Sequence, residues 1–136
     1  MPAFARQAAS SYRQTQVQSR TPLELTVMLY DGALRFLAQA RAAIERKDIP
    51  ARRDAISRTM AILSELQSTL DMEKGGAVAE SLDRLYVYVN SRLIDASFKQ
   101  DVRPVDEATR LLTTLRDAWE NITSAAPVAA PVRVAR

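Results

Sequence analysis

The sequence predicts an all-α fold, an antiparallel up-down four-helix bundle, and three observations lead to this prediction. Apolar residues recur at intervals of three and four along four segments of the 136-residue chain, which is the spacing of one face of an α-helix. Residues that favour helix starts precede these segments, and short turns separate them. The three glycines and six prolines lie mostly at the expected helix boundaries and in the C-terminal tail. Amphipathic helices joined by short turns bury their apolar stripes most simply by packing antiparallel.

The first helix is expected from Thr21 to about Lys47. Its start, Thr21-Pro22-Leu23-Glu24, is a capping box, in which each of the two end side chains accepts a hydrogen bond from the other residue's backbone. Residues 48–50, Asp-Ile-Pro, predict a turn, because proline fits the first turn of a following helix. The second helix is expected at about residues 51–70. Its apolar stripe consists of Ile56, Met60, Leu63, Leu66 and Leu70, and Ile49 of the preceding turn continues the same stripe.

Gly75-Gly76 is expected to end this segment with a tight turn, because glycine adopts turn conformations without steric cost. The third helix should then run over about residues 77–98. The fourth should begin near Pro104, where the acidic residues 106 and 107 suit the helix dipole. The core stripe of the third helix is Val78, Leu82, Leu85, Val89, Leu93 and Ala96, and that of the fourth is Val105, Ala108, Leu112, Leu115, Trp119 and Ile122.

The bundle is therefore expected to form one domain, residues 21–122, between two flanking segments. Residues 1–20 are polar and small, but Phe4, Ala8 and Tyr12 stand at helical spacing, so we expect a mobile segment that is able to form a short, loosely attached helix. Residues 123–136 are rich in alanine and proline, a composition typical of disordered tails.

The composition restricts the chemistry that the chain can perform. It contains no cysteine and no histidine, which removes the thiol nucleophile, the disulfide, the commonest general base and the commonest metal ligand. The Glu-x-x-His pairs that build di-metal sites in helical bundles are also missing. We therefore expect no enzyme, no metal and no cofactor. An enzyme that uses carboxylates in the bundle core remains as a distant alternative.

The charges point to no particular class of partner. The chain has 19 basic and 16 acidic residues, and its densest basic cluster is Arg46-Lys47, Arg52-Arg53 and Arg58. Such a cluster binds nucleic acid or an acidic partner, or it is a solvated turn. Interleaved acidic residues and the lack of an aromatic platform favour the solvated turn, so no nucleic acid is expected. No apolar run approaches the length that spans a bilayer, and the N-terminus lacks a signal peptide's apolar core, so a cytoplasmic location without membrane insertion is expected.

Two helices carry more apolar surface than a bundle needs. On a helical wheel, the first helix has a second apolar stripe beside its core stripe. This second stripe consists of Leu25, Leu29, Ala33, Phe36 and Ala40. Opposite the core stripe of the third helix lie Val87, Ile94 and Phe98, with Tyr86 and Asn90 between the two faces. These residues either pack under the N-terminal segment or are ordinary exposed apolar residues of a protein surface. The alternative is that they form a groove for an amphipathic helix of another protein.

At this point the motifs resemble those of a known family. The opening pattern is Tyr12, Val17, Thr21-Pro22-Leu23-Glu24-Leu25 and Met28-Leu29-Tyr30-Asp31-Gly32-Ala33. The centre is Leu70-Asp71-Met72-Glu73-Lys74-Gly75-Gly76, and later pieces are Leu82, Leu85-Tyr86-Val87-Tyr88, Arg92-Leu93, Ala96, Ala118-Trp119 and Ile122. In this order, over about residues 12–122, they resemble the flagellar export chaperone FliS family. Ser97, Val87 and the Ala/Pro-rich tail depart from the family's usual pattern.

The resemblance implies a cytoplasmic chaperone that binds the disordered C-terminal segment of flagellin. It prevents premature polymerisation and helps to deliver the subunit to the flagellar type III export apparatus. In this family the segment that carries Tyr12 and Val17 caps the binding surface when no client is bound. An export-gate protein, an anti-sigma factor or a co-chaperone are further partners that the family suggests.

From the surplus apolar surface and the resemblance together, we expect client contact at seven residues: Leu25, Leu29, Phe36, Tyr86, Val87, Ile94 and Phe98. A self-associating helical scaffold, in which the extra stripe is a homodimer seam, is the alternative.

Overall fold

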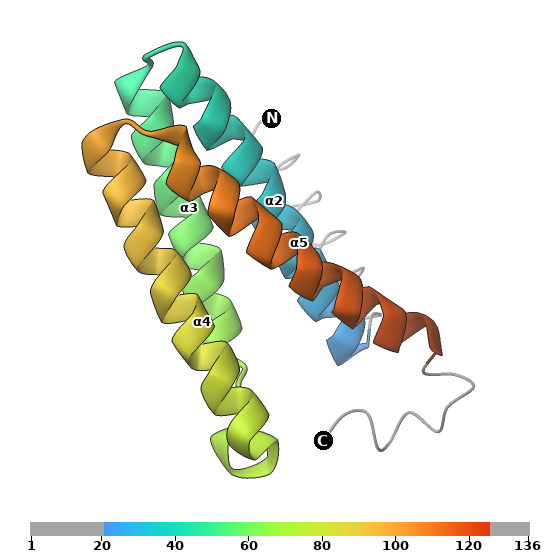
Figure 1. Ribbon diagram of the computed structural model, residues 1–136. Coiled ribbons are helices and arrows are strands. Elements are labelled where there is room, and N and C mark those ends of the chain that lie inside the picture. Colours follow the sequence, from blue (N-terminus) through green and yellow to red (C-terminus); the bar gives the residue numbers. More distant parts are fainter. Residues whose placement is uncertain (1–20, 126–136) are drawn as a thin grey trace, which may run out of the picture.

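The computed structural model describes residues 21–125 as four α-helices with short turns between them (Figure 1). They are α2 (Pro22–Glu45), α3 (Ile49–Ser68), α4 (Met72–Lys99) and α5 (Val102–Ala125). Helix α2 packs mainly against α3 and α5, and α4 packs mainly against the same two helices. The described residues therefore confirm an all-α bundle, in which α2 and α4 occupy diagonal positions.

Side-chain caps fix where three of the helices begin. The capping box at α2 is confirmed, because the backbone N–H of Glu24 lies 3.1 Å from the Thr21 hydroxyl and the Thr21 N–H lies 2.9 Å from the Glu24 carboxylate. Asp48 accepts from the N–H of Ala51 at 3.1 Å and starts α3. Asp71 accepts from two backbone N–H groups of the first turn of α4. Each cap satisfies donors that have no partner within the helix.

The expected Gly75-Gly76 turn is confirmed as a break in the helical backbone, but it is not the turn that follows α3. The turn between α3 and α4 comes earlier, at residues 69–71, and both glycines lie in the first turns of α4. Gly76 nevertheless interrupts the helical backbone with φ 52° and ψ −130°, a conformation that side chains with a Cβ rarely adopt. Gly76 therefore places a kink between a first helical turn at residues 72–75 and the rest of α4, which begins at residue 77 as expected.

The core contains most of the predicted stripe residues. Leu37, Leu63, Leu93 and Leu112, one from each helix, are almost completely buried. The stripe of α5 is confirmed at Val105, Ala108 and Leu112, and Leu115 and Trp119 pack partly against the core. Ala33 and Ala40, which we assigned to the second stripe of the first helix, also lie in the core.

Two predicted core residues are exposed. Val78 is 67% exposed because it follows the kink at Gly76, which turns the start of α4 away from the rest of the stripe. Ile49 is exposed as the first residue of α3, where no neighbouring turn covers it. Both errors come from helix ends, where an unbroken periodicity no longer describes which side of the helix faces the core.

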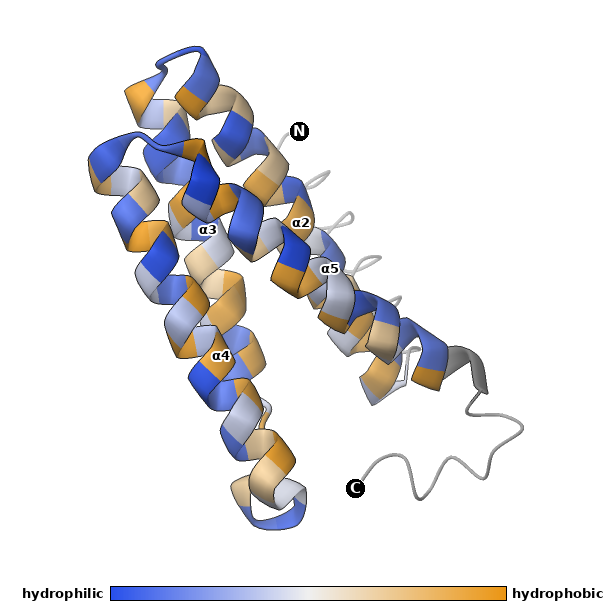
Figure 2. Cartoon of the chain, viewed as in Figure 1, coloured by the Kyte–Doolittle hydropathy of each residue, from blue (hydrophilic) through white to orange (hydrophobic). Residues whose placement is uncertain are grey.

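The two helix pairs of the bundle diverge toward one end. In Figure 1, α2 lies beside α5 and α3 beside α4, and the pairs separate toward the end that holds Thr21 and the 69–71 turn. The opposite end, with the turns at 46–48 and 100–101, is compact. Figure 2 shows apolar and polar residues alternating along α4 and α5, as amphipathic helices require. The outer face of each helix is thus mostly polar, and exceptions to this pattern are informative.

Candidate protein-binding surfaces

The outer face of α4 is the main exception. Val87, Ile94 and Phe98 are 54%, 40% and 83% exposed, so three large apolar side chains face outward on one stripe. Their spacing of seven and four residues keeps them on the same side of the helix. We call these three residues the α4 stripe. Their exposure agrees with the expectation that this face lacks a partner among the described residues.

A hollow of about 250 Å³ lies beside the α4 stripe, between α3 and α4. Ile94 and Phe98 line it from α4, and Ile56 and Met60 line it from α3. Arg53, Ser57 and Ser97 supply the polar part of its wall. We call this hollow the α3–α4 groove. Two apolar anchors beside a concave apolar wall are the form of site that receives an amphipathic helix.

Tyr86 does not belong to this surface, and its assignment to client contact is corrected. Its side chain is only 2% exposed, and its hydroxyl lies 2.5 Å from that of Tyr30. The burial raises the pKa of Tyr86, which therefore stays neutral at ordinary pH. Tyr86 lies between the two faces of α4, and the periodicity alone left open which of them it joined.

The second stripe of the first helix lies elsewhere on the molecule. Leu25, Leu29 and Phe36 are all half-buried on α2, and Leu29 packs against the core. The Phe36 ring lies 5.7 Å from the guanidinium carbon of Arg58, a cation–π contact between α2 and α3. Because α2 and α4 are diagonal, these residues and the α4 stripe do not form a single groove. A client that contacts both must wrap around the bundle.

An apolar cleft that the sequence did not predict lies at the divergent end. It has a volume of about 260 Å³, and Leu23, Leu70, Val78, Leu82 and Trp119 contribute to its lining. Its residues come from all four helices, which separate there. Two signals in the sequence pointed to it: an apolar valine two residues after a Gly-Gly pair, and the family-like motif at residues 70–76. Tyr12 and Val17, the expected cap residues, lie outside the described part of the chain.

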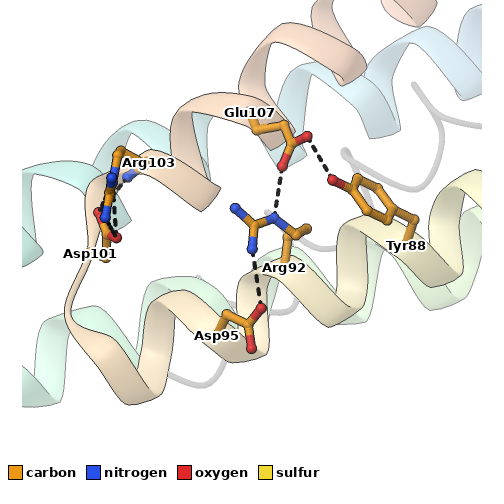
Figure 3. Close-up of polar contacts among 6 residues, drawn as sticks. All are labelled: Tyr88, Arg92, Asp95, Asp101, Arg103 and Glu107. Carbon is orange, nitrogen blue, oxygen red and sulfur yellow. Dashed lines mark hydrogen bonds and ion pairs between the residues drawn. The ribbon is translucent and has the colours of Figure 1, made fainter.

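An ionic network holds α4 and α5 together on the face drawn in Figure 3. The Glu107 carboxylate accepts from the Tyr88 hydroxyl at 2.7 Å and from Nε of Arg92 at 2.8 Å. These two bonds hold the pKa of Glu107 below its usual range, and the bond to Glu107 raises the pKa of Tyr88. Arg92 also reaches Asp95 at 3.2 Å (Figure 3). Each of these polar groups has a partner within the chain, so the network stabilises the packing of α4 against α5.

Charge is divided unequally between the two ends of the bundle. When each helix is split at its midpoint, the compact end has eleven basic and seven acidic residues, a net charge of +4. The divergent end, up to residue 122, has three basic and nine acidic residues, a net charge of −6. A partner that spans the bundle therefore meets potentials of opposite sign at its two ends.

Neither a metal-ligand cluster nor a membrane-spanning helix is found among residues 21–125. Within residues 21–125, no group of three or more acidic side chains is placed to hold a metal ion. None of the four described helices is long and apolar enough to cross a membrane. The notable features of this surface are instead the α4 stripe, the α3–α4 groove and the apolar cleft, all of which suit contact with another polypeptide.

Comparison with known proteins agrees with this surface. The family described as flagellar protein FliS matches residues 5–126. The flagellar secretion chaperone FliSB of Pseudomonas aeruginosa is 37% identical over 123 residues, covering 88% of this chain and 98% of that protein. The flagellar secretion chaperones FliS of Salmonella typhimurium and Bacillus subtilis are 36% and 34% identical, covering 80% and 82% of this chain and 82% of each relative. The chain therefore belongs to the FliS family of flagellar proteins.

Proposed function

We propose that this protein is a cytoplasmic flagellar export chaperone whose client is the disordered C-terminal segment of flagellin. It keeps the bound subunit from polymerising early and aids its delivery to the flagellar type III secretion apparatus. The single observation that carries this proposal is the α4 stripe, with Phe98 83% exposed beside the α3–α4 groove. The relatives' description as flagellar secretion chaperones supports the same class of function.

The physical reason is that the chaperone offers flagellin an apolar surface in place of the one on which flagellin polymerises. Flagellin's terminal segments polymerise by burying apolar helical faces, so a chaperone has to offer those faces an alternative apolar partner. Burial of apolar area contributes roughly 25 cal/mol per Å². A segment that folds as it binds buries roughly 1,000–3,000 Å² and spends roughly 2–5 kcal/mol on becoming ordered. This cost keeps binding reversible, which a chaperone that must release its client requires.

In this proposal the client contacts the α4 stripe and the outer face of α2, including Leu25, Leu29 and Phe36. The diagonal placement of α2 and α4 favours a client that wraps around the bundle over one that lies in a single groove. Tyr86 is omitted from this contact set, because its side chain is only 2% exposed and does not lie on the outer face of α4.

The N-terminal segment is proposed as a displaceable cap, with Tyr12 and Val17 as its apolar contacts. Residues 1–20 contain three arginines and no acidic residue, and they join α2 at the end of the bundle with a net charge of −6. Opposite charges therefore favour contact between this segment and the divergent end, where the apolar cleft lies. An export-gate protein, an anti-sigma factor or a co-chaperone are proposed as further partners, without an assigned surface.

Co-expression with flagellin tests the proposed function. Full-length flagellin should co-purify with the chaperone in a defined ratio, and flagellin without its last few dozen residues should not. Equal recovery of both forms would contradict recognition of the C-terminal segment. Light scattering of the free chaperone over a concentration series tests the alternative, because a homodimer that forms through the α4 stripe would be replaced by a monomer in a Phe98→Asp variant.

A further inference from the structure

The proposed client surface leaves the apolar cleft at the divergent end without an occupant. Val78 in its lining is 67% exposed, because the kink at Gly76 turns this part of α4 away from the core stripe. Other apolar side chains of the lining are half-buried, namely Leu23, Leu70, Leu82 and Trp119. A segment that covers these side chains removes apolar area from water, which favours its binding.

The C-terminal tail of the chain, residues 126–136, begins at the same end of the bundle. Helix α5 runs from the compact end to the divergent end and ends at Ala125, six residues after Trp119 of the cleft (Figure 1). Six residues of helix correspond to about 9 Å along the axis. The eleven residues of the tail reach about 34 Å in an extended polyproline conformation. The tail is therefore long enough to turn back from the end of α5 and enter the cleft.

The composition of the tail suits an apolar cleft with an aromatic wall. Its sequence, Ala-Pro-Val-Ala-Ala-Pro-Val-Arg-Val-Ala-Arg, holds three valines and two prolines. Prolines favour an extended backbone that loses little conformational entropy on binding, and proline-rich segments dock in grooves lined by aromatic side chains. Trp119 supplies such a ring to the cleft. The tail thus offers small apolar side chains on a backbone that is already extended.

Charge also favours contact between the tail and this end. The divergent end has a net charge of −6, and Glu73 and Glu80 of α4 are exposed there without an ion pair within residues 21–125. The tail has no acidic side chain and carries Arg133 and Arg136. Lys74 is the single cation among the residues that line the cleft. The arginines are therefore attracted to the divergent end.

Charge alone does not distinguish the tail from residues 1–20, which are also basic and join the bundle at the same end. Size does distinguish them. Residues 1–20 have the spacing of a helix, and a helix with its side chains is about 10–12 Å wide. The cleft, at about 260 Å³, is smaller than the roughly 300–1,000 Å³ of sites that enclose a drug-sized ligand. It therefore suits a few valine and proline side chains better than a helix.

We propose that residues 127–136 fold back and dock in the apolar cleft of their own chain. The valines of the tail contact Val78 and Trp119, and its arginines face the carboxylates at the start of α4. Because the tail is covalently attached, its effective concentration at the cleft is about millimolar, so a weak contact is populated. The family match ends at residue 126, so the docking segment lies beyond it. A partner that uses the cleft has to displace the tail.

Engineered disulfides test this docking in the full-length protein, which has no cysteine of its own. Under mild oxidation of dilute protein, the pair Val78→Cys and Val132→Cys should form an intramolecular disulfide at least about fivefold faster than the pair Val87→Cys and Val132→Cys. The second pair is the matched control, because Val87 is also an exposed valine of α4 but does not line the cleft. Non-reducing electrophoresis measures both rates.

Two results of this experiment would overturn the inference. The first is an equal rate for the Val78 and Val87 pairs. The second is a faster disulfide between Val78→Cys and Val17→Cys than between Val78→Cys and Val132→Cys, which would assign the cleft to the N-terminal segment.

Trp119 gives an independent measurement, because it is the single tryptophan of the chain. In the full-length protein, Val132→Asp and Arg133→Glu should each raise the quenching of Trp119 fluorescence by acrylamide, up to about twofold, because the tail leaves the cleft. Arg110→Glu is the control for charge, since it makes the same change at an exposed site of α5 outside the cleft. Unchanged quenching in both tail variants would overturn the inference. Neither measurement involves flagellin, so either failure leaves the proposed function intact.

Discussion

The hydroxyl oxygens of Tyr30 and Tyr86 lie 2.5 Å apart in the core, although 56 residues separate them in the sequence. The indole N–H of Trp119 donates to the same Tyr30 oxygen at 3.3 Å, so three side chains from α2, α4 and α5 meet in one polar contact. Tyr86 and Trp119 also line the apolar cleft at the divergent end. The contact therefore ties the two helix pairs together at the edge of the region where they separate.

Removing one member of this contact should destabilise the protein. In Tyr30→Phe, the Tyr86 hydroxyl loses its described partner, and a buried group left unsatisfied costs roughly 1–3 kcal/mol. Tyr86→Phe should cost less, because Tyr30 keeps Trp119. The double variant should lose less stability than the sum of the two single variants, because the hydroxyls interact. Urea unfolding monitored by Trp119 fluorescence measures all three, and strict additivity would contradict a direct bond.

The two adjacent glycines should respond to alanine for different reasons. A Cβ at Gly76 meets nothing within 4 Å, so the cost of Gly76→Ala comes from its backbone with φ 52°, and we expect a loss of about 1–3 kcal/mol. A Cβ at Gly75 would lie 2.7 Å from the Cβ of Ala79, so a Gly75→Ala and Ala79→Gly pair should recover stability lost in Gly75→Ala alone. Urea unfolding tests both, and a stabilised Gly76→Ala variant would show that the kink is not required.

These elements also show what the sequence could predict. Caps and periodicity located the helices well, because Thr21 and Asp48 act through neighbours within one turn. The break at Gly76 was predicted, but the helical turn before it was not, since a Gly-Gly pair suits both a turn between helices and a break within one. Tyr86 was misassigned because tertiary packing decides which flank of α4 is covered.

Acid should weaken the ties that involve Glu107 and Asp101. Hydrogen bonds from Tyr88 and Arg92 lower the pKa of Glu107, and those from Arg103 lower the pKa of Asp101 to about 2. Each carboxylate has a lower pKa in the folded state than in the unfolded state, so the unfolded state binds protons more readily. The carboxylate's contribution to stability is therefore fully present above its unfolded pKa, and it is lost as pH falls through its folded pKa. The contribution of Asp101 should therefore disappear between about pH 4 and pH 2.

Thermal unfolding from pH 6 to pH 2 measures this effect. The parent protein should lose Tm more steeply over this range than the Glu107→Gln and Asp101→Asn variants, which lack the titrating group. Both variants should be less stable than the parent at pH 6, and the difference should shrink in acid. Parallel curves for parent and variants would show that neither carboxylate has a lowered pKa in the folded state.

The α4 stripe should separate binding from folding. Ile94→Asp places a charge on a side chain that is 40% exposed, so we expect client affinity to fall while stability stays within about 1 kcal/mol of the parent. Leu93→Ala is the opposite case on the adjacent residue, which is completely buried, and it should cost roughly 2–5 kcal/mol. Its folded fraction should still bind the client, because Leu93 faces the core. Loss of folding in Ile94→Asp would assign Ile94 to the core and remove it from the client surface.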